Sequence, residues 1–161
     1  MVTMKKFLIL GNLNACCYKE IFPLLRENKI WLGVNPKGGS RKGNIMGFII
    51  NDEVGYVPAW WYTNIDHNKR HIPLKLTKSY NATDYPLYDN YNGINVNKTV
   101  DIPMDYNGVM GVPVSFLDKY CPEQFEILGQ MANTNVDEYN FGYPFVNGIR
   151  KYARILIRKK L

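Results

Sequence analysis

The segment "TNIDHNKRH", residues 63–71, concentrates hydrogen-bonding and cationic side chains within a short stretch. Lys69 and Arg70 carry positive charges that can meet phosphate groups. Asn64, His67 and His71 carry amide or ring nitrogens of the kind that reach base edges. These residue types in this grouping predict a contact with nucleic acid, and we take all five as candidate DNA-binding residues.

The aromatic residues Trp60, Trp61 and Tyr62 come directly before this segment. Their rings can stack on bases, as aromatic side chains do in proteins that bind single strands. They can equally alternate across a strand and build a core. The sequence leaves both alternatives open.

Charge is distributed unevenly along the chain. Residues 1–80 hold 12 Lys and Arg against 5 Asp and Glu, residues 81–149 hold 2 against 9, and residues 150–161 hold 6 against 0. If the two basic segments meet in space, they form a positive face suited to phosphates. We therefore add Arg154, Arg158 and Lys159 to the candidate DNA-binding residues and expect weak, salt-dependent binding of duplex DNA. The alternative is solvated surface charge.

Motifs for other chemistry are missing from the sequence. Gly38 and Gly43 have the separation of a phosphate-binding loop, but Asn44 stands where that loop needs lysine, so we predict a flexible connector. The two histidines have no metal-ligand spacing, and no nucleophile motif occurs. The cysteines, Cys16, Cys17 and Cys121, are odd in number and fit reduced thiols. We expect no catalytic residue and no metal site in this chain, a cytoplasmic location, and no membrane segment.

The opening of the chain has the rhythm of an α/β sheet. The apolar run "KKFLILGN", residues 5–12, predicts a strand buried on both faces in a parallel sheet. Residues 14–28 predict a helix, capped by Asn14 and kinked or shortened by Pro23, and residues 29–34 predict a second strand. We expect a β-α-β unit within a single domain covering residues 1–161.

The rest of the chain predicts β-structure and ordered loops. A hairpin turns near Asn51 and Asp52, and a strand covers residues 71–80. Residues 81–108 form a long loop held by its tyrosines, "GVPVSFL" a short strand or turn, and "CPEQFEIL" a short helix with Pro122 in its first turn. Residues 131–148 form a loop, and "RKYARILIRKKL" forms a closing strand with basic flanks.

Four long stretches resemble the EcoRI-type adenine-specific DNA methyltransferase family. They are "FLILGNLNACCYKEIFPLLRENKIWLG", "WWYTNIDHNKRH", "YPLYDNYNGINVNKTVDIPMDYNGVMGVPVSFLDKYCPEQFEILG" and "RILIRKK". The resemblance covers nearly the whole chain, except residues 35–57 and 131–147. It implies a partial Rossmann-like methyltransferase sheet, namely its last strands, with a β-rich, loop-rich recognition extension.

The resemblance also implies methyl transfer from S-adenosylmethionine to the N6 amine of adenine, with the base extruded from the duplex. The family uses an Asn-Pro-Pro-Phe motif and a cofactor-binding strand-loop, both ahead of the "FLILGN" strand. This sequence contains no Pro-Pro pair, and Asn35–Pro36 is followed by Lys37. We therefore expect the C-terminal portion of such an enzyme, inactive alone, that binds no cofactor by itself.

Two further hypotheses remain open at this point. The chain is an accessory module that completes a catalytic partner, or it is an aromatic-rich domain that binds protein or glycan. The apolar strand at residues 7–10 predicts self-association into a homodimer, or pairing with the missing N-terminal half, through a bare sheet edge.

Overall fold

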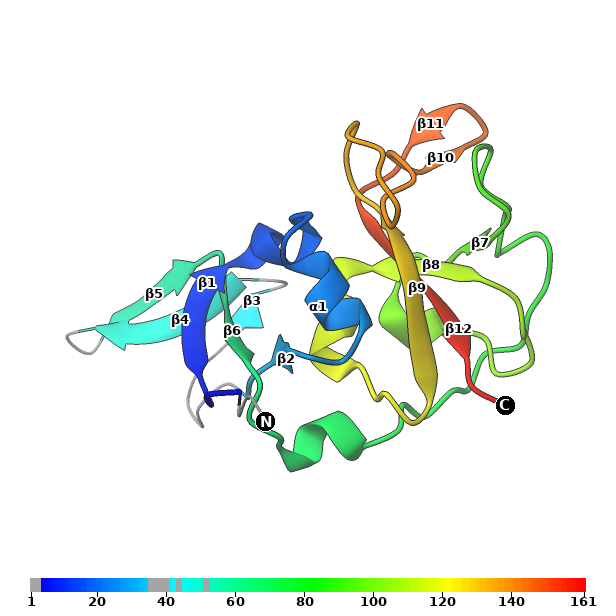
Figure 1. The fold of residues 1–161 in the computed structure, drawn as a ribbon. Helices are drawn as coiled ribbons and strands as arrows, with labels where there is room; N and C mark the ends of the chain where they lie inside the picture. Colours follow the sequence, from blue (N-terminus) through cyan, green and yellow to red (C-terminus); the bar gives the residue numbers. More distant parts are fainter. Residues whose placement is uncertain (1–3, 35–40, 43–44, 51–52) are drawn as a thin grey trace. The chain divides into compact units, whose positions relative to one another are not determined.

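The computed structural model describes residues 4–34, 41–42, 45–50 and 53–161, and the chain divides into two compact units. Unit 1 spans Met1–Lys69 and unit 2 spans Arg70–Leu161. The chain is mixed α/β, with several small sheets and short helices in the described ranges (Figure 1). None of these helices is long and apolar enough to cross a membrane.

Unit 1 contains two three-stranded sheets, with the strand orders β1-β6-β2 and β3-β4-β5 in its described ranges. Its elements are β1 (Leu8–Asn12), the 3-10 helix η1 (Leu13–Cys17), α1 (Phe22–Arg26), β2 (Trp31–Leu32), β3 (Arg41–Lys42), β4 (Ile45–Ile50), β5 (Glu53–Val57) and β6 (Ala59–Thr63). A 3-10 helix, η2 (Asn68–His71), follows at the boundary between the units.

The predicted hairpin is present as β4 and β5. The two strands pair antiparallel, and their last pair before the turn is Ile50 with Glu53. The predicted turn residues Asn51 and Asp52 lie outside the described residues, as does the glycine-rich stretch 35–40.

The prediction of a fully buried first strand was wrong. β1 pairs with β6 alone among the described strands, and the pairing is antiparallel. Leu8 and Ile9 are each 56% exposed and Leu10 is 44% exposed, so apolar side chains on both sides of the strand reach solvent. A continuous apolar run is typical of a strand that is covered on both faces, but the run itself does not determine whether neighbouring elements cover the strand.

The predicted β-α-β unit is also not formed as expected. β1 and β2 both run antiparallel to β6, which lies between them, so they share a direction without pairing. The predicted helix shortens to η1 and α1, and Asn12, not Asn14, accepts the capping hydrogen bond. Pro23 follows Phe22 in the first turn of α1, where a backbone N–H has no partner within the helix, so proline is tolerated at this position.

Unit 2 is built on a four-stranded sheet with the order β7-β8-β12-β9 and on a two-stranded hairpin, β10-β11. Its elements after η2 are β7 (Ile94–Asn95), η3 (Thr99–Asp101), β8 (Met110–Pro113), η4 (Val114–Lys119), β9 (Phe125–Met131), β10 (Phe145–Val146), β11 (Ile149–Arg150) and β12 (Arg154–Lys159). The predicted closing strand and the predicted short strand near residue 111 are therefore confirmed.

β12 lies between β8 and β9 and pairs antiparallel with both (Figure 1). Ile155, Leu156 and Ile157 are completely buried, which is the pattern of a strand with neighbours on each edge and cover on each face. Leu156 joins Tyr88, Met131 and Val146 in one apolar cluster. The latest strand in the sequence is thus central to the core of unit 2.

Two local predictions in unit 2 were wrong. Residues 71–80 form no strand; their only paired position is an isolated bridge from Lys78 to Pro103, and the Gln124 side chain bonds both main-chain groups of Leu74. Instead of a helix at residues 121–128, a turn leads into β9, whose Phe125 and Ile127 are buried. Buried and half-buried side chains alternate along the first residues of β9, as expected for a strand and not for a helix.

The prediction that tyrosines hold the loop at residues 81–108 is confirmed. Tyr85 and Tyr88 are buried; the Tyr85 hydroxyl donates to the Asp101 carbonyl at 2.5 Å and the Tyr88 hydroxyl to the Asn95 Oδ1 at 2.9 Å. The predicted loop at residues 131–148 includes the hairpin β10-β11, which was not expected.

Candidate nucleic-acid interface

The predicted contact residue Asn64 is buried and holds the backbone ahead of β1. Its Oδ1 accepts from the Phe7 amide at 2.9 Å, and its Nδ2 donates to the Lys5 carbonyl at 2.9 Å. Thr63 adds a hydroxyl bond to the Phe7 carbonyl at 2.6 Å. These bonds extend the pairing of β1 and β6 by side chains, so Asn64 fixes the course of the chain.

The next candidate, His67, is half-buried and bonded within unit 1. Its Nε2 lies 2.8 Å from the Leu32 carbonyl, which can only accept, so this nitrogen carries the proton. The bond fixes the ring against β2 and fixes the loop that leads into η2.

η2 brings Lys69, Arg70 and His71 together on one short turn. Lys69 is half-buried, Arg70 is buried and His71 is exposed. Within unit 2, the His71 Nδ1 contacts the Glu123 carboxylate, and this hydrogen bond holds the pKa of Glu123 below its usual value. The turn therefore presents a histidine-carboxylate pair at the surface.

Arg154 is a buried side chain at the start of β12. Its Nε donates to Asn95 Oδ1 at 3.1 Å, and its Nη1 donates to the carbonyls of Tyr152 at 3.1 Å and Ala153 at 3.4 Å. Tyr88 donates to the same Asn95 oxygen. Burial lowers the pKa of Arg154 and raises that of Tyr88.

The other two candidates on β12 also have partners within unit 2. Arg158 forms an ion pair with Glu126, which lies opposite it on β9, with an Nη2 to Oε1 distance of 2.6 Å. The Lys159 ammonium donates to the Met104 carbonyl. Each side chain still reaches the surface, unlike Arg154.

The aromatic residues of β6 contribute to the interior. Trp60 and Tyr62 are buried, so these two residues belong to the core, and Trp61 between them is half-buried. The Tyr62 hydroxyl donates to the Asn12 carbonyl at 2.9 Å, which ties β6 to the end of β1.

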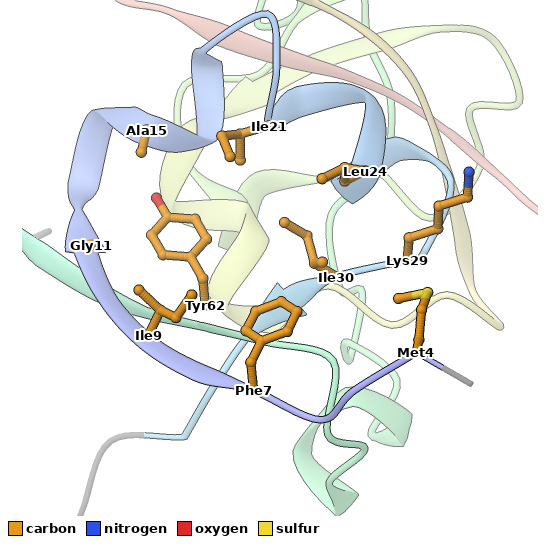
Figure 2. Close-up of a pocket in the computed structure, with 10 residues that line it drawn as sticks. All are labelled: Met4, Phe7, Ile9, Gly11, Ala15, Ile21, Leu24, Lys29, Ile30 and Tyr62. Atoms are coloured by element: carbon orange, nitrogen blue, oxygen red, sulfur yellow. The ribbon is translucent and has the colours of Figure 1, made fainter. Parts of the chain in front are cut away.

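An apolar pocket of about 360 Å³ lies between β1, β6 and the segment around α1 in unit 1 (Figure 2). Aliphatic and aromatic side chains line it, and its one charged side chain, Lys29, is paired with Glu27 at 2.7 Å. Its lining residues are Met4, Phe7, Ile9, Gly11, Ala15, Ile21, Leu24, Lys29, Ile30 and Tyr62. This lining suits apolar side chains and not a nucleotide.

The two adjacent thiols near this pocket form a hydrogen-bonded pair. The sulfur atoms of Cys16 and Cys17 are 3.8 Å apart, and Cys16 also bonds the Leu13 carbonyl. The shared hydrogen bond raises the pKa of Cys16 and lowers that of Cys17, so Cys17 is the more nucleophilic of the two. Cys16, Cys17 and Cys121 are all free thiols, as predicted.

Comparison with known proteins decides the family. A family profile described as "Adenine-specific methyltransferase EcoRI" matches residues 1–160. The chain belongs to the EcoRI-type adenine-specific methyltransferase family. No solved structure matches significantly.

Three relatives in this family are Type II methyltransferases. The chain is 45% identical to M.EcoRI of Escherichia coli over 97% of its own length and 51% of the relative's. It is 33% identical to M.MgeORF184P of Mycoplasma genitalium and 31% identical to M.MpnI of Mycoplasma pneumoniae, covering 97% of this chain and 57% of each relative. The chain therefore spans about half the length of these relatives.

The sequence alone does not single out residues 150–152 at the end of β11. Arg150, Lys151 and Tyr152 were treated only as the flank of the closing strand, although a tyrosine between cations is itself a signal for nucleic-acid contact. The signal was present in the sequence; what was missing was the knowledge that the chain turns there.

Proposed function

We propose that this chain is the DNA-binding, target-recognition portion of an adenine-N6-specific DNA methyltransferase of the restriction-modification type, and that it transfers no methyl group by itself. The observation that carries the proposal is the partial match. The chain covers about half of each relative, and its sequence has neither a Pro-Pro pair nor a glycine-rich cofactor loop. S-adenosylmethionine binding and catalysis then belong to the remainder of the enzyme.

The proposed division of labour follows from what the chemistry needs. The reaction requires an extruded adenine and a methyl donor held in line, and such positioning supplies much of the rate. Units 1 and 2 would act as one recognition domain, and the sheet of unit 1 would adjoin a Rossmann-like sheet in that remainder.

The candidate residues divide by their surroundings. Asn64, His67 and Arg154 hold backbone segments in place, so we assign them a positioning role beside the DNA. Direct phosphate contacts are proposed for Lys69 on η2 and for the group His71, Arg158 and Lys159. Arg70 is buried, so it is assigned a positioning role on the same turn. The ion pair of Arg158 is partly exposed and worth less than about 1 kcal/mol, so a phosphate can replace its carboxylate.

Methyl incorporation from labelled S-adenosylmethionine into duplex DNA tests the catalytic half of the proposal. The purified chain is expected to give no incorporation above a protein-free control, with the full-length E. coli relative as the positive control. Turnover by the 161-residue chain would contradict the proposal.

Salt-dependent DNA binding tests the other half. Each phosphate contact contributes a slope of about −0.9 to the dependence of log affinity on log salt. Lys69→Ala with Arg70→Ala should therefore flatten the slope by about one, the contribution of Lys69. Lys98→Ala with Lys119→Ala, two exposed lysines outside the basic segments, is the matched control. Binding that is absent at low salt would leave the aromatic-rich protein- or glycan-binding alternative.

A second candidate function is that of an accessory chain completing a split methyltransferase. The observation in its favour is the exposed edge strand β1 beside the apolar pocket of unit 1. We propose that this surface receives polypeptide corresponding to the unmatched half of the relatives, or a second copy in its absence. Sedimentation equilibrium should show association for the wild type and less for Ile9→Lys; a monomer in both would remove the self-pairing argument. We propose a cytoplasmic location for either form, which the free thiols of the three cysteines support.

A further inference from the structure

The segment at and after β11 carries an exposed aromatic ring, an exposed arginine and a half-buried lysine. Tyr152 is 89% exposed and Ile149 is 63% exposed, although both flank a core sheet. A hollow of about 580 Å³ lies beside them, lined by Tyr143, Arg150, Lys151, Tyr152 and Ala153.

The hairpin that carries these side chains is held firmly. Asp89 accepts from the amides of Asn147 at 2.9 Å and Gly148 at 2.7 Å, and its own amide donates to the Phe145 carbonyl. Asn147 and Gly148 have φ values of 49° and 75°, so the turn occupies the left-handed region. The side chains beyond the turn are therefore presented on a fixed backbone.

The backbone on the far side of the hollow is fixed as well. The Lys151 amide donates to the Pro144 carbonyl at 2.8 Å, and Arg154 holds the carbonyls of Tyr152 and Ala153 from inside unit 2. The ring of Tyr152 is thus free while its main chain is anchored. This pre-organisation lowers the entropy lost when a ligand binds.

The cations match the same ligand. The Arg150 guanidinium lies 4.7 Å from the centre of the Tyr143 ring, which holds it beside the hollow, and Lys151 is half-buried next to it. An aromatic face flanked by two cations is the combination that binds an unstacked base and its phosphates.

We propose that the β10-β11 hairpin, with residues 150–152, binds an unpaired DNA base by stacking it on Tyr152, with Arg150 and Lys151 at the adjoining phosphates. The inference rests on the proposed DNA-binding function and names the form of DNA that this surface reads. Duplex DNA without an unstacked base offers the ring no exposed face, so the hairpin discriminates between the two forms.

Fluorescence anisotropy with three labelled DNAs tests this inference: a single strand, a perfect duplex and a duplex with one unpaired adenine. Tyr152→Ala should weaken binding to the single strand and the unpaired-base duplex by about 5- to 100-fold, the range of a lost base-aromatic stack. Binding to the perfect duplex should change by less than about twofold. Tyr152→Phe should keep wild-type affinity, since the ring is what stacks.

Tyr18→Ala is the matched control, because Tyr18 is an exposed tyrosine beside Lys19 in unit 1. If Tyr152→Ala binds all three DNAs as the wild type does, the stacking proposal is overturned while DNA binding by the chain stands; a protein ligand for the hairpin gives this result. If the wild type binds none of the DNAs at low salt, the proposed function fails and takes this inference with it.

Discussion

The strand β12 and the hairpin β10-β11 carry the same kinds of side chain within a few residues of each other, yet the fold uses them in opposite ways. On β12, Arg154 is buried in hydrogen bonds and Arg158 is paired with Glu126. Around β11, Arg150 and Tyr152 face solvent. A count of charges treats the whole segment as one basic patch, but position in a sheet decides which cations remain available to a ligand.

The difference has a simple physical origin. A central strand has covered faces and neighbours on both edges, so a cation at its start must find partners inside or leave an unsatisfied group. A two-stranded hairpin has few such constraints: Val146 of β10 packs in the core, while the Asp89 carboxylate accepts hydrogen bonds from the amides of the exposed turn. In the central strand the cations form hydrogen bonds and ion pairs within the fold, whereas in the hairpin Arg150 remains exposed for a ligand.

Removing Arg154 should have the largest effect on stability. Arg154→Ala leaves the Tyr152 carbonyl without its donor and opens a cavity, so the free energy of unfolding should fall by about 3 kcal/mol. Arg150→Ala, from the exposed region, should change it by less than about 0.5 kcal/mol. Urea unfolding of both variants measures the contrast; equal losses would erase the distinction between the two regions.

Two glycines sharpen the comparison in the same way. A Cβ on Gly111 would lie 2.0 Å from the Tyr88 hydroxyl oxygen, so Gly111→Ala should cost about 2 kcal/mol by overpacking. A Cβ on Gly148 meets nothing within 4 Å, and Gly148→Ala should cost about 1 kcal/mol, from its φ of 75° alone. Thermal unfolding of the two variants gives the order, and a greater loss for Gly148→Ala would contradict it.

Loss of the Asp89 carboxylate should loosen the hairpin without unfolding the sheet. Asp89→Ala leaves the amides of Asn147 and Gly148 without acceptors, which should cost about 1 kcal/mol locally. Hydrogen exchange should quicken at these two amides and stay unchanged at Leu156 in β12. Asp105→Ala, which removes the acceptor for the Tyr80 amide, is the control. Uniformly faster exchange would show that the hairpin and the core open together.

The smallest effect is expected at the exposed His71–Glu123 pair. The pKa of Glu123 is lowered by its hydrogen bond with His71, so the carboxylate adds stability above its unfolded pKa, and that stability is lost as pH falls through the lower folded value. Because the pair is largely exposed, the difference between the wild type and Glu123→Gln should be below about 0.5 kcal/mol near pH 6 and disappear once the pH has fallen below the folded pKa of Glu123. A larger difference at the acid end would contradict the sign.

Prediction from the sequence was most successful where residues close together in the chain determine the local structure. The hairpin β4-β5 and the strand β12 have turn residues and apolar runs that determine them locally, and the tyrosines of the long loop are packed as expected. It was less successful where the burial of a strand depends on which other strands lie beside it. β1 and β12 are both apolar runs, yet one is an exposed edge and the other a buried centre, because neighbours far away in sequence differ.

The same limit explains the candidate site. The residue types of Asn64 and Arg154 suit DNA, and the sequence places them in basic segments, but their side chains are committed to backbone groups or to residues many positions away. Conversely, Tyr152 follows a turn that depends on Asp89, some sixty positions earlier, so nothing nearby in the sequence announces that its ring is exposed. Composition indicated residue types that can bind DNA, whereas contacts between residues distant in the sequence determine which of those side chains are exposed.

The position of β12 also governs how unit 2 can fold. β8 and β9 are connected in the sheet only through β12, which lies between them. Each therefore has an unpaired edge until β12, the last strand in the sequence, is in place. Pairing across such sequence separations is slow, because the loop-closure entropy must be lost before the contacts compensate for it. During that interval the edges and apolar faces of β8 and β9 can pair with other chains. Refolding should therefore give more aggregate as protein concentration rises, and a chaperone that shields unpaired strands should raise the yield.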